Sequence, residues 1–103
     1  MALIQVTRDN YDADVRRSAK PVLLDFYADW CGPCKMLVPV LEEIASEHPE
    51  YVIAKINVDD EPDLARQFGI TSIPALFVIR DGEVTDNVVG YRPKSSILEL
   101  LEG

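Results

Sequence analysis

Residues 22–35 read Val22-Leu23-Leu24-Asp25-Phe26-Tyr27-Ala28-Asp29-Trp30-Cys31-Gly32-Pro33-Cys34-Lys35, and they hold the only two cysteines of the 103-residue chain. Two residues separate Cys31 from Cys34, so the two thiols can close a small disulfide ring and reopen it as a dithiol. A bridge over so short a loop constrains almost none of the unfolded chain, which makes a purely structural disulfide a poor explanation. The pair is therefore a candidate for exchanging electrons with disulfides elsewhere.

The residues around the pair predict a strand followed by a helix. The nearly continuous apolar run of residues 22–27 is typical of a central strand buried on both faces, and Asp25 interrupts it. A helix is expected from about Pro33 to Glu47, with a kink and not a break at Pro39. The stripe expected to face inward consists of Met36, Leu37, Val40, Leu41, Ile44 and Ala45.

The rest of the chain continues the alternation of strands and helices. A strand on each side of the helix favours parallel pairing through a crossover, whereas Arg80-Asp81-Gly82-Glu83 is a hairpin turn signal that requires an antiparallel pair. We expect one domain over residues 1–103, an α/β fold with a central mixed β-sheet flanked by helices on both sides. The further strands are expected at 3–7, 51–58, 76–79 and 84–89, and the further helices at 10–18, 63–68 and 94–102.

Composition excludes several classes of function. Hydrophobic residues make up 48% of the chain, enough for a core without a disulfide framework. The net charge is -8 with no basic run, so binding to nucleic acid or to an anionic membrane has no electrostatic support. No apolar stretch approaches the length of a membrane span. No secretory signal is visible at the amino terminus, so the cytoplasm is the expected location.

The order of the two cysteines predicts different roles for them. If a helix begins near Cys31, unpaired backbone N–H groups and the positive end of the helix dipole favour a thiolate there. Pro33 suits the first turn, where its missing N–H would lack a partner anyway. Cys34 lies one turn further in and is expected to be more buried. We therefore expect Cys31 to attack and Cys34 to resolve.

Other interpretations of the pair remain. Zinc needs about four ligands, and beyond the two sulfurs the chain offers only His48 and scattered carboxylates. Two inert buried thiols fit poorly with the Gly-Pro insert and the adjacent Trp30. A binding module that keeps the motif is the stronger competitor, since a fold does not fix a function. An oxidase or isomerase would share the chemistry at a different redox potential.

The stretch from Asp25 to Met36 closely resembles the active site of the thioredoxin family. The resemblance continues through Pro39, the segment Lys55-Ile56-Asn57-Val58-Asp59, the segment Gly69-Ile70-Thr71-Ser72-Ile73-Pro74 and Gly90, in the same order. Trp-Cys-Gly-Pro-Cys is far more specific than a bare Cys-x-x-Cys pair. The residues between the sulfurs match reducing members, which implies reduction of protein disulfides.

The resemblance also implies a proton acceptor behind the cysteines. Asp25 matches a buried aspartate that helps to deprotonate the second cysteine, and burial raises the pKa of a carboxyl group as such a role requires. Lys55 matches a lysine close to that aspartate. Two alternatives stay open: an aspartate that only bonds to backbone groups, and a solvated lysine at a strand end.

A substrate groove is implied around the first sulfur, which is expected to be exposed. Ile73-Pro74 matches a cis-proline that faces the cysteines, and the backbone at Ile73 would pair with an extended substrate segment. A place for Trp30 at this groove is favoured over a place in the core. The groove residues are expected to be Trp30, Gly32, Pro33, Ile73, Pro74 and Gly90.

The resemblance implies partners and no bound group. A thioredoxin reductase, a flavoprotein that uses NADPH and FAD, would recycle the oxidised chain. Disulfide-containing proteins would be the targets. The chain itself needs no cofactor or metal, because the cysteine pair is the redox centre, and it is expected to act as a monomer. Tyr27 and Ala75 depart from the tryptophan and threonine usual in the family, which bears on local packing, potential and partner preference.

Overall fold

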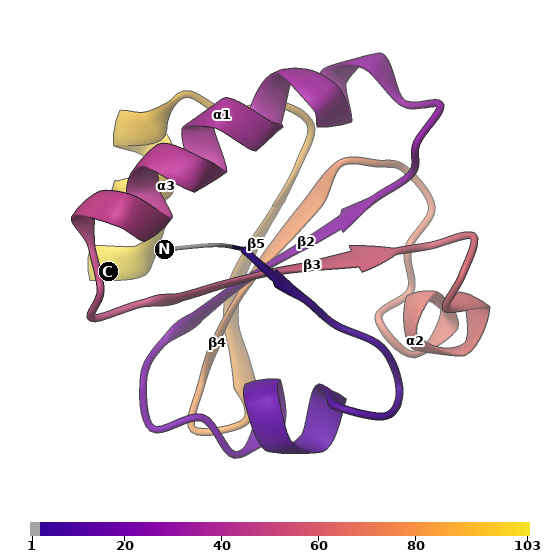
Figure 1. Cartoon of the computed structure of the whole chain (residues 1–103), viewed down its shortest axis with the longest axis horizontal. Helices are drawn as coiled ribbons and strands as arrows, with labels where there is room; N and C mark the ends of the chain where they lie inside the picture. The colour runs from indigo at the N-terminus through magenta and orange to yellow at the C-terminus, as the bar shows by residue number, and fades with distance from the viewer. Residues whose placement is uncertain (1–2) are drawn as a thin grey trace.

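The computed structural model describes residues 3–103 and places five strands and four helical segments among them (Figure 1). The expected strands and helices are present with bounds within two residues of those predicted. In chain order the elements are β1 (Ile4–Gln5), the π-helix η1 (Asp12–Arg16), β2 (Val22–Tyr27), α1 (Gly32–Glu47), β3 (Val52–Asn57), α2 (Pro62–Gln67), β4 (Ala75–Arg80), β5 (Glu83–Val89) and α3 (Lys94–Glu102).

The strands form one mixed sheet in the order β1-β3-β2-β4-β5, which confirms the predicted fold class. β1, β3 and β2 are parallel, while β4 and β5 run antiparallel to their neighbours. Asp81 (φ 53°) and Gly82 (φ 82°) turn the β4–β5 hairpin with two left-handed residues, as a two-residue turn requires. β2 lies at the centre, which explains its nearly unbroken apolar sequence.

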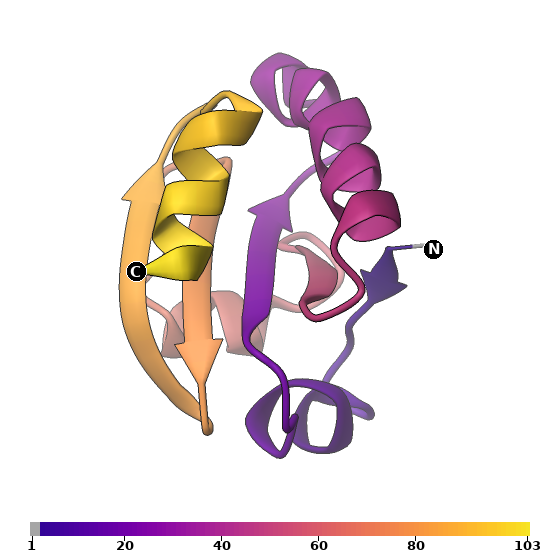
Figure 2. The same ribbon diagram turned by 90° about the vertical axis from the view of Figure 1, so that its left-hand side faces the viewer.

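Helices cover both faces of the sheet. Figure 2 shows α1 and α3 on one face and α2 behind the other. Alternate residues of β2 therefore enter two separate cores: Leu23 packs beneath α1 and α3, and Phe26 packs with η1 and α2. On the second face three aromatic rings, those of Phe26, Phe68 and Phe77, lie 5.0–5.6 Å apart between centroids.

Two sequence predictions need correction. The helix expected at 10–18 is a five-residue π-helix, in which the N–H of Arg17 bonds to the carbonyl of Asp12 five residues back. Its one buried side chain is Val15, so little packing supports a longer regular helix. Met36, expected to face inward, is 63% exposed. At 100° per residue it is turned away from Leu37, and the buried stripe of α1 is Cys34, Leu37, Leu41, Ile44 and Ala45.

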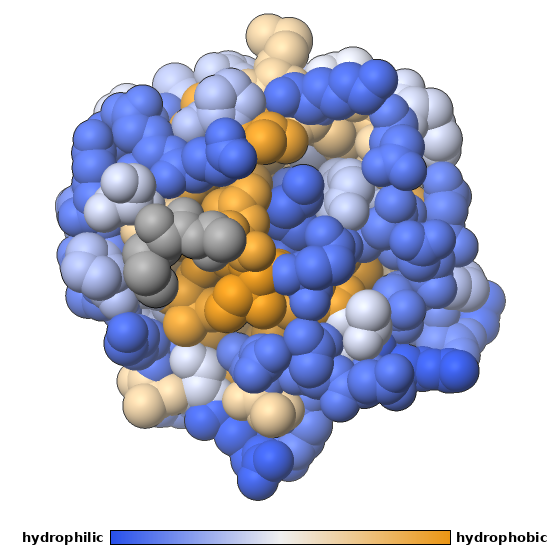
Figure 3. Space-filling model, viewed as in Figure 1, coloured by the Kyte–Doolittle hydropathy of each residue, from blue (hydrophilic) through white to orange (hydrophobic). Residues whose placement is uncertain are grey.

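The β1 edge of the sheet carries apolar surface (Figure 3). Among residues 3–103, β1 pairs with Ala54 and Lys55 of β3. A hollow of about 230 Å³ there is lined mainly by Ile4, Ala45, Pro49, Tyr51, Val52 and Ile53. Within residues 3–103 no helix has the length and apolar character needed to cross a bilayer.

Candidate functional site

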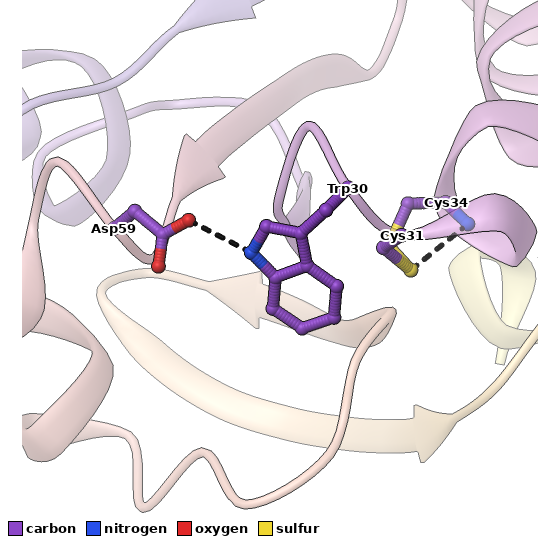
Figure 4. Close-up of a disulfide and its surroundings, with 4 residues drawn as sticks. All are labelled: Trp30, Cys31, Cys34 and Asp59. Carbon is purple, nitrogen blue, oxygen red and sulfur yellow. Dashed lines mark hydrogen bonds between the residues drawn. A yellow bond between two sulfur atoms is a disulfide. The ribbon is translucent and has the colours of Figure 1, made fainter.

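Cys31 and Cys34 form a disulfide at the amino end of α1, with their Cα atoms 5.3 Å apart. Cys31 is the N-cap residue, and its Sγ accepts a hydrogen bond from the backbone N–H of Cys34 at 3.2 Å (Figure 4). Pro33 occupies the first turn, where its missing N–H needs no partner. When the bridge opens, the same N–H and the helix dipole lie where they favour a Cys31 thiolate.

Both cysteines are largely covered in this oxidised state. Cys31 is 5% exposed and Cys34 2%, so the expected order of burial holds by a small margin. The expectation of an exposed first sulfur is wrong, because Val58 and Ile73 pack against the bridge. Gly32 and Pro33, between the sulfurs, are exposed.

Asp25 lies in the middle of β2, on the face that α1 covers. It is 1% exposed, and neither carboxyl oxygen has a hydrogen-bond partner among residues 3–103. The expected alternative, an aspartate bonded to backbone groups, is therefore not met. Burial raises the pKa of Asp25 from 3.8 to about 7, although the positive charge of Lys55 acts in the opposite direction. A carboxyl group with this pKa can accept and return a proton at neutral pH.

Lys55 is the neighbour of Asp25 on the parallel strand β3. Its ammonium lies 4.3 Å from the centroid of the Tyr27 ring, and the residue is half-buried, not fully solvated. Lys55 also lines a hollow of about 290 Å³ beside the second cysteine. The hollow lies between α1 and the strands β2 and β3, and its lining consists of Tyr27, Ala28, Asp29, Cys34, Lys35, Val38 and Lys55.

Trp30 lies at the surface next to the bridge, not in the core. Trp30 is 71% exposed, and its indole N–H donates a hydrogen bond to an Asp59 carboxylate oxygen at 3.0 Å. Figure 4 shows the indole turned toward Asp59, with the two cysteines on its other side. A shallow hollow of about 200 Å³ runs from Trp30 to Ile73. Its other lining residues are Val58, Ala65, Ile70, Thr71 and Ser72.

The Ile73–Pro74 peptide bond is cis, and Ile73 packs against the cysteine pair. Pro74 is buried, and its carbonyl accepts a hydrogen bond from the N–H of Gly90 at 2.7 Å. Gly90 has φ +96°, a conformation that favours glycine. The structure thus brings Trp30, Ile73 and the bridge together, and links Gly90 to them through Pro74.

Two contacts of the site were not predicted from the sequence. Asp59 was named only as the last residue of a segment that resembles the family, yet its carboxylate accepts the hydrogen bond of the Trp30 indole. The contact between Lys55 and Tyr27 was missed as well. Neither has a local sequence signal, because each joins residues 28 or 29 positions apart. The register of β2 on β3, which places Asp25 beside Lys55, would have suggested the second contact.

A vicinal pair of cysteines at a helix N-terminus, beside a buried carboxyl group with a pKa near neutrality, defines a dithiol–disulfide redox protein. The family model for thioredoxin matches residues 2–103. The thioredoxin of Staphylococcus haemolyticus is 46% identical over 103 residues, covering 99% of this chain and 97% of the relative.

Other bacteria have similar proteins. The thioredoxin of Mycobacterium bovis is 48% identical over 101 residues, with 97% of this chain and 87% of the relative covered. That of Streptomyces clavuligerus is 46% identical over 96 residues, with 93% and 90% covered. The chain belongs to the thioredoxin family. It is a thiol–disulfide oxidoreductase of the thioredoxin type, with Cys31 and Cys34 as its redox pair.

Proposed function

We propose that the chain reduces protein disulfides by two successive thiol–disulfide exchanges. The Cys31 thiolate attacks one sulfur of a target disulfide, forms a mixed disulfide and releases the other target sulfur as a thiolate. The Cys34 thiolate then attacks the Cys31 sulfur, closes the intramolecular bridge and releases the second target thiolate. The target gains two electrons and the chain loses two. The observation that carries this order is the hydrogen bond from the Cys34 N–H to the Cys31 Sγ at the start of α1.

Asp25 acts in this proposal as the base that removes the proton of Cys34 in the second step. This role is supported by two observations: the Asp25 carboxyl group has no hydrogen-bond partner among residues 3–103, and burial raises its pKa to about 7. Lys55 serves as the neighbouring positive charge that keeps the carboxylate form accessible. Lys55 and Cys34 line the same hollow, which opens to the surface.

The substrate segment binds, in this proposal, along the surface between the indole and the cis-proline loop. Trp30 and Ile73 line a shallow apolar hollow next to the bridge, which supports an extended peptide as the ligand. Gly32 and Pro33 form the exposed surface of the active-site turn. Pro74 and Gly90 hold the loop that presents the Ile73 backbone.

Family membership implies disulfide-containing targets and a thioredoxin reductase in general. We propose that the reductase is a flavoprotein that draws electrons from NADPH. We further propose that the chain works in the cytoplasm as a monomer and that residues 1–103 form a single thioredoxin domain. The net charge of -8 gives no electrostatic support for nucleic acid or an anionic membrane as a partner.

Reduction of insulin in the presence of dithiothreitol tests the proposal. We expect the chain to accelerate precipitation of the insulin B chain by at least about 10²-fold over dithiothreitol alone. Cys31→Ser removes the attacking sulfur and is expected to return the rate to that background. Cys34→Ser keeps the attacking sulfur but cannot resolve the mixed disulfide, so we expect the reduced variant, freed of dithiothreitol before insulin is added, to accumulate a covalent adduct with insulin.

The matched control is Ser46→Cys in the Cys31→Ser chain, which restores the number of thiols at an exposed position of α1 outside the site. It should remain inactive. A wild-type rate equal to that of dithiothreitol alone, with insulin still bound by Cys31→Ser, would instead show a binding module whose redox state is incidental.

A further inference from the structure

The Lys55 ammonium is held by an aromatic ring and not by an ion pair. Its Nζ lies 4.3 Å from the centroid of Tyr27, a geometry in which the ring face attracts a cation. No salt bridge found within residues 3–103 includes Lys55. A lysine ammonium on a flexible four-carbon stem otherwise samples many positions in solvent. The ring therefore decides where this positive charge is found.

Tyr27 is in turn anchored from the neighbouring edge strand. The amide nitrogen of Gln5 donates a hydrogen bond to the Tyr27 hydroxyl oxygen at 3.0 Å. Gln5 stands opposite Lys55 in the β1–β3 pairing, and Lys55 stands opposite Asp25 in the β3–β2 pairing. The three residues thus form one row across three strands, on the face covered by α1. Tyr27 lies two residues beyond Asp25 on the same face and closes over Lys55.

We infer that Tyr27, anchored by Gln5, is a positioning residue that holds the Lys55 ammonium beside Asp25 and so sets the strength of Asp25 as a base. The inference rests on the proposed roles of Asp25 and Lys55. It adds Tyr27, which packs against the cluster of Ala28 and the two cysteines, and Gln5, which anchors the Tyr27 hydroxyl. It also gives a function to Tyr27, the position at which this chain departs from the tryptophan usual in its family.

The direction of the effect follows from the charges that surround Asp25. The positive charge of Lys55 lowers the pKa of Asp25, against the larger effect of burial. If the ammonium drifts into solvent, the carboxylate loses that support and its pKa rises. The β4 neighbour of Asp25 is the apolar Leu76, which adds no charge. The other titratable groups that face this region come from β2, the turn after it and α1, and they are Tyr27, Asp29, Cys34 and Lys35.

The test is the titration of the Asp25 carboxyl carbon by NMR in the oxidised protein, where the cysteines do not titrate. Tyr27→Leu removes the ring, and we expect it to raise the Asp25 midpoint by about half a pH unit. Lys55→Met removes the charge and should raise the midpoint at least as far. The double variant should match Lys55→Met alone, because the ring acts only through the ammonium.

Two further variants separate positioning from simple packing. Tyr27→Trp keeps an aromatic face for the ammonium, and it should leave the midpoint within about 0.2 units of the wild-type value. Tyr51→Leu is the matched control, a half-buried tyrosine just before the start of β3 and outside the site. It should leave the midpoint unchanged.

Each contrary result has a distinct meaning. If the Asp25 midpoint shifts in Lys55→Met but not in Tyr27→Leu, the positioning role of Tyr27 is overturned and the proposed role of Lys55 stays intact. Additive shifts in the double variant would also overturn it, since Tyr27 would then act on Asp25 by another route. An unmoved midpoint in Lys55→Met would overturn both the inference and the proposed role of Lys55.

Discussion

The two faces of the sheet bury different kinds of side chain. The face under η1 and α2 holds an apolar cluster in which Phe26 contacts two other aromatic rings. The face under α1 and α3 is also apolar along most of its length, but it includes Asp25, fully buried and without a hydrogen-bond partner among residues 3–103. Successive residues of the same strand thus serve opposite purposes.

Two neighbouring residues of β2 therefore have different roles: Phe26 stabilises the fold, and Asp25 belongs to the redox site. An aromatic side chain such as Phe26 stabilises the fold through buried area and ring contacts. A buried carboxyl group does the reverse, because its charged form loses hydration. The pKa of Asp25, raised to about 7, measures that loss. The chain keeps this unfavourable group on the α1 face, where the cysteines are, whereas the cluster on the opposite face consists of apolar side chains only.

The largest expected effect is a loss of stability, caused by a substitution in the apolar cluster under η1 and α2. Phe26→Ala should lower the free energy of unfolding by about 3–5 kcal/mol, through lost burial and the cavity left among the rings. Urea unfolding measures this change. Insulin reduction per folded molecule should stay within about two-fold of the wild type below the melting temperature, since Phe26 points away from the cysteines. A large loss of activity in folded protein would break the separation of the two faces.

A smaller effect, on rate, is expected from the other face. Asp25→Asn should slow the release of the reduced target in a single turnover by about 10²-fold at pH 7, the usual contribution of a general base. As the pH rises, hydroxide competes with Asp25 as the base, so the difference in rate between the two proteins should narrow toward pH 9. Stopped-flow rates from pH 6 to 9 check this. A rate ratio that stays constant across that range would contradict a base role.

The smallest effect concerns the surface beside the bridge. Trp30→Ala should raise KM for insulin by about ten-fold with little change in kcat, because an exposed indole contributes mainly binding energy. Asp59→Asn keeps a hydrogen-bond acceptor for the indole N–H and serves as the matched control, with an expected change below about two-fold. A fall in kcat with unchanged KM would place Trp30 in the chemical step and not in binding.

The sequence predicted the fold well because its signals are local. The apolar run at 22–27, the Asp81-Gly82 turn and Pro33 in the first turn of α1 each depend on a few adjacent residues, and the mixed sheet follows from these signals. The prediction of a helix at residues 10–18 was less accurate, because a single buried valine supports only a short π-helix there. Met36 was misplaced because an apolar side chain in a helix does not by itself face the core.

The site was predicted less completely, for a physical reason. The cysteine motif is contiguous, so residue types and helix geometry suffice to place Cys31 at the N-cap. The partners of Trp30 and Lys55 are set by the register of strands distant in the sequence, which residue types do not reveal. The burial of the bridge was also missed, because it depends on Val58 and Ile73 from two other segments.

The most direct test of the division between the two faces is the pH dependence of unfolding in the oxidised wild type and Asp25→Asn. In the wild type the folded pKa of about 7 lies above the ordinary value of 3.8. The folded state therefore holds its proton longer than the unfolded state, and stability falls as pH rises between these values.

We predict that the stability of the variant relative to the wild type increases by about 4 kcal/mol from pH 4 to pH 8, from a shift of about three pKa units. An amide introduced in place of the carboxyl adds only a pH-independent difference, so the slope is the decisive quantity. A stability difference that does not change between pH 4 and 8 would contradict the account.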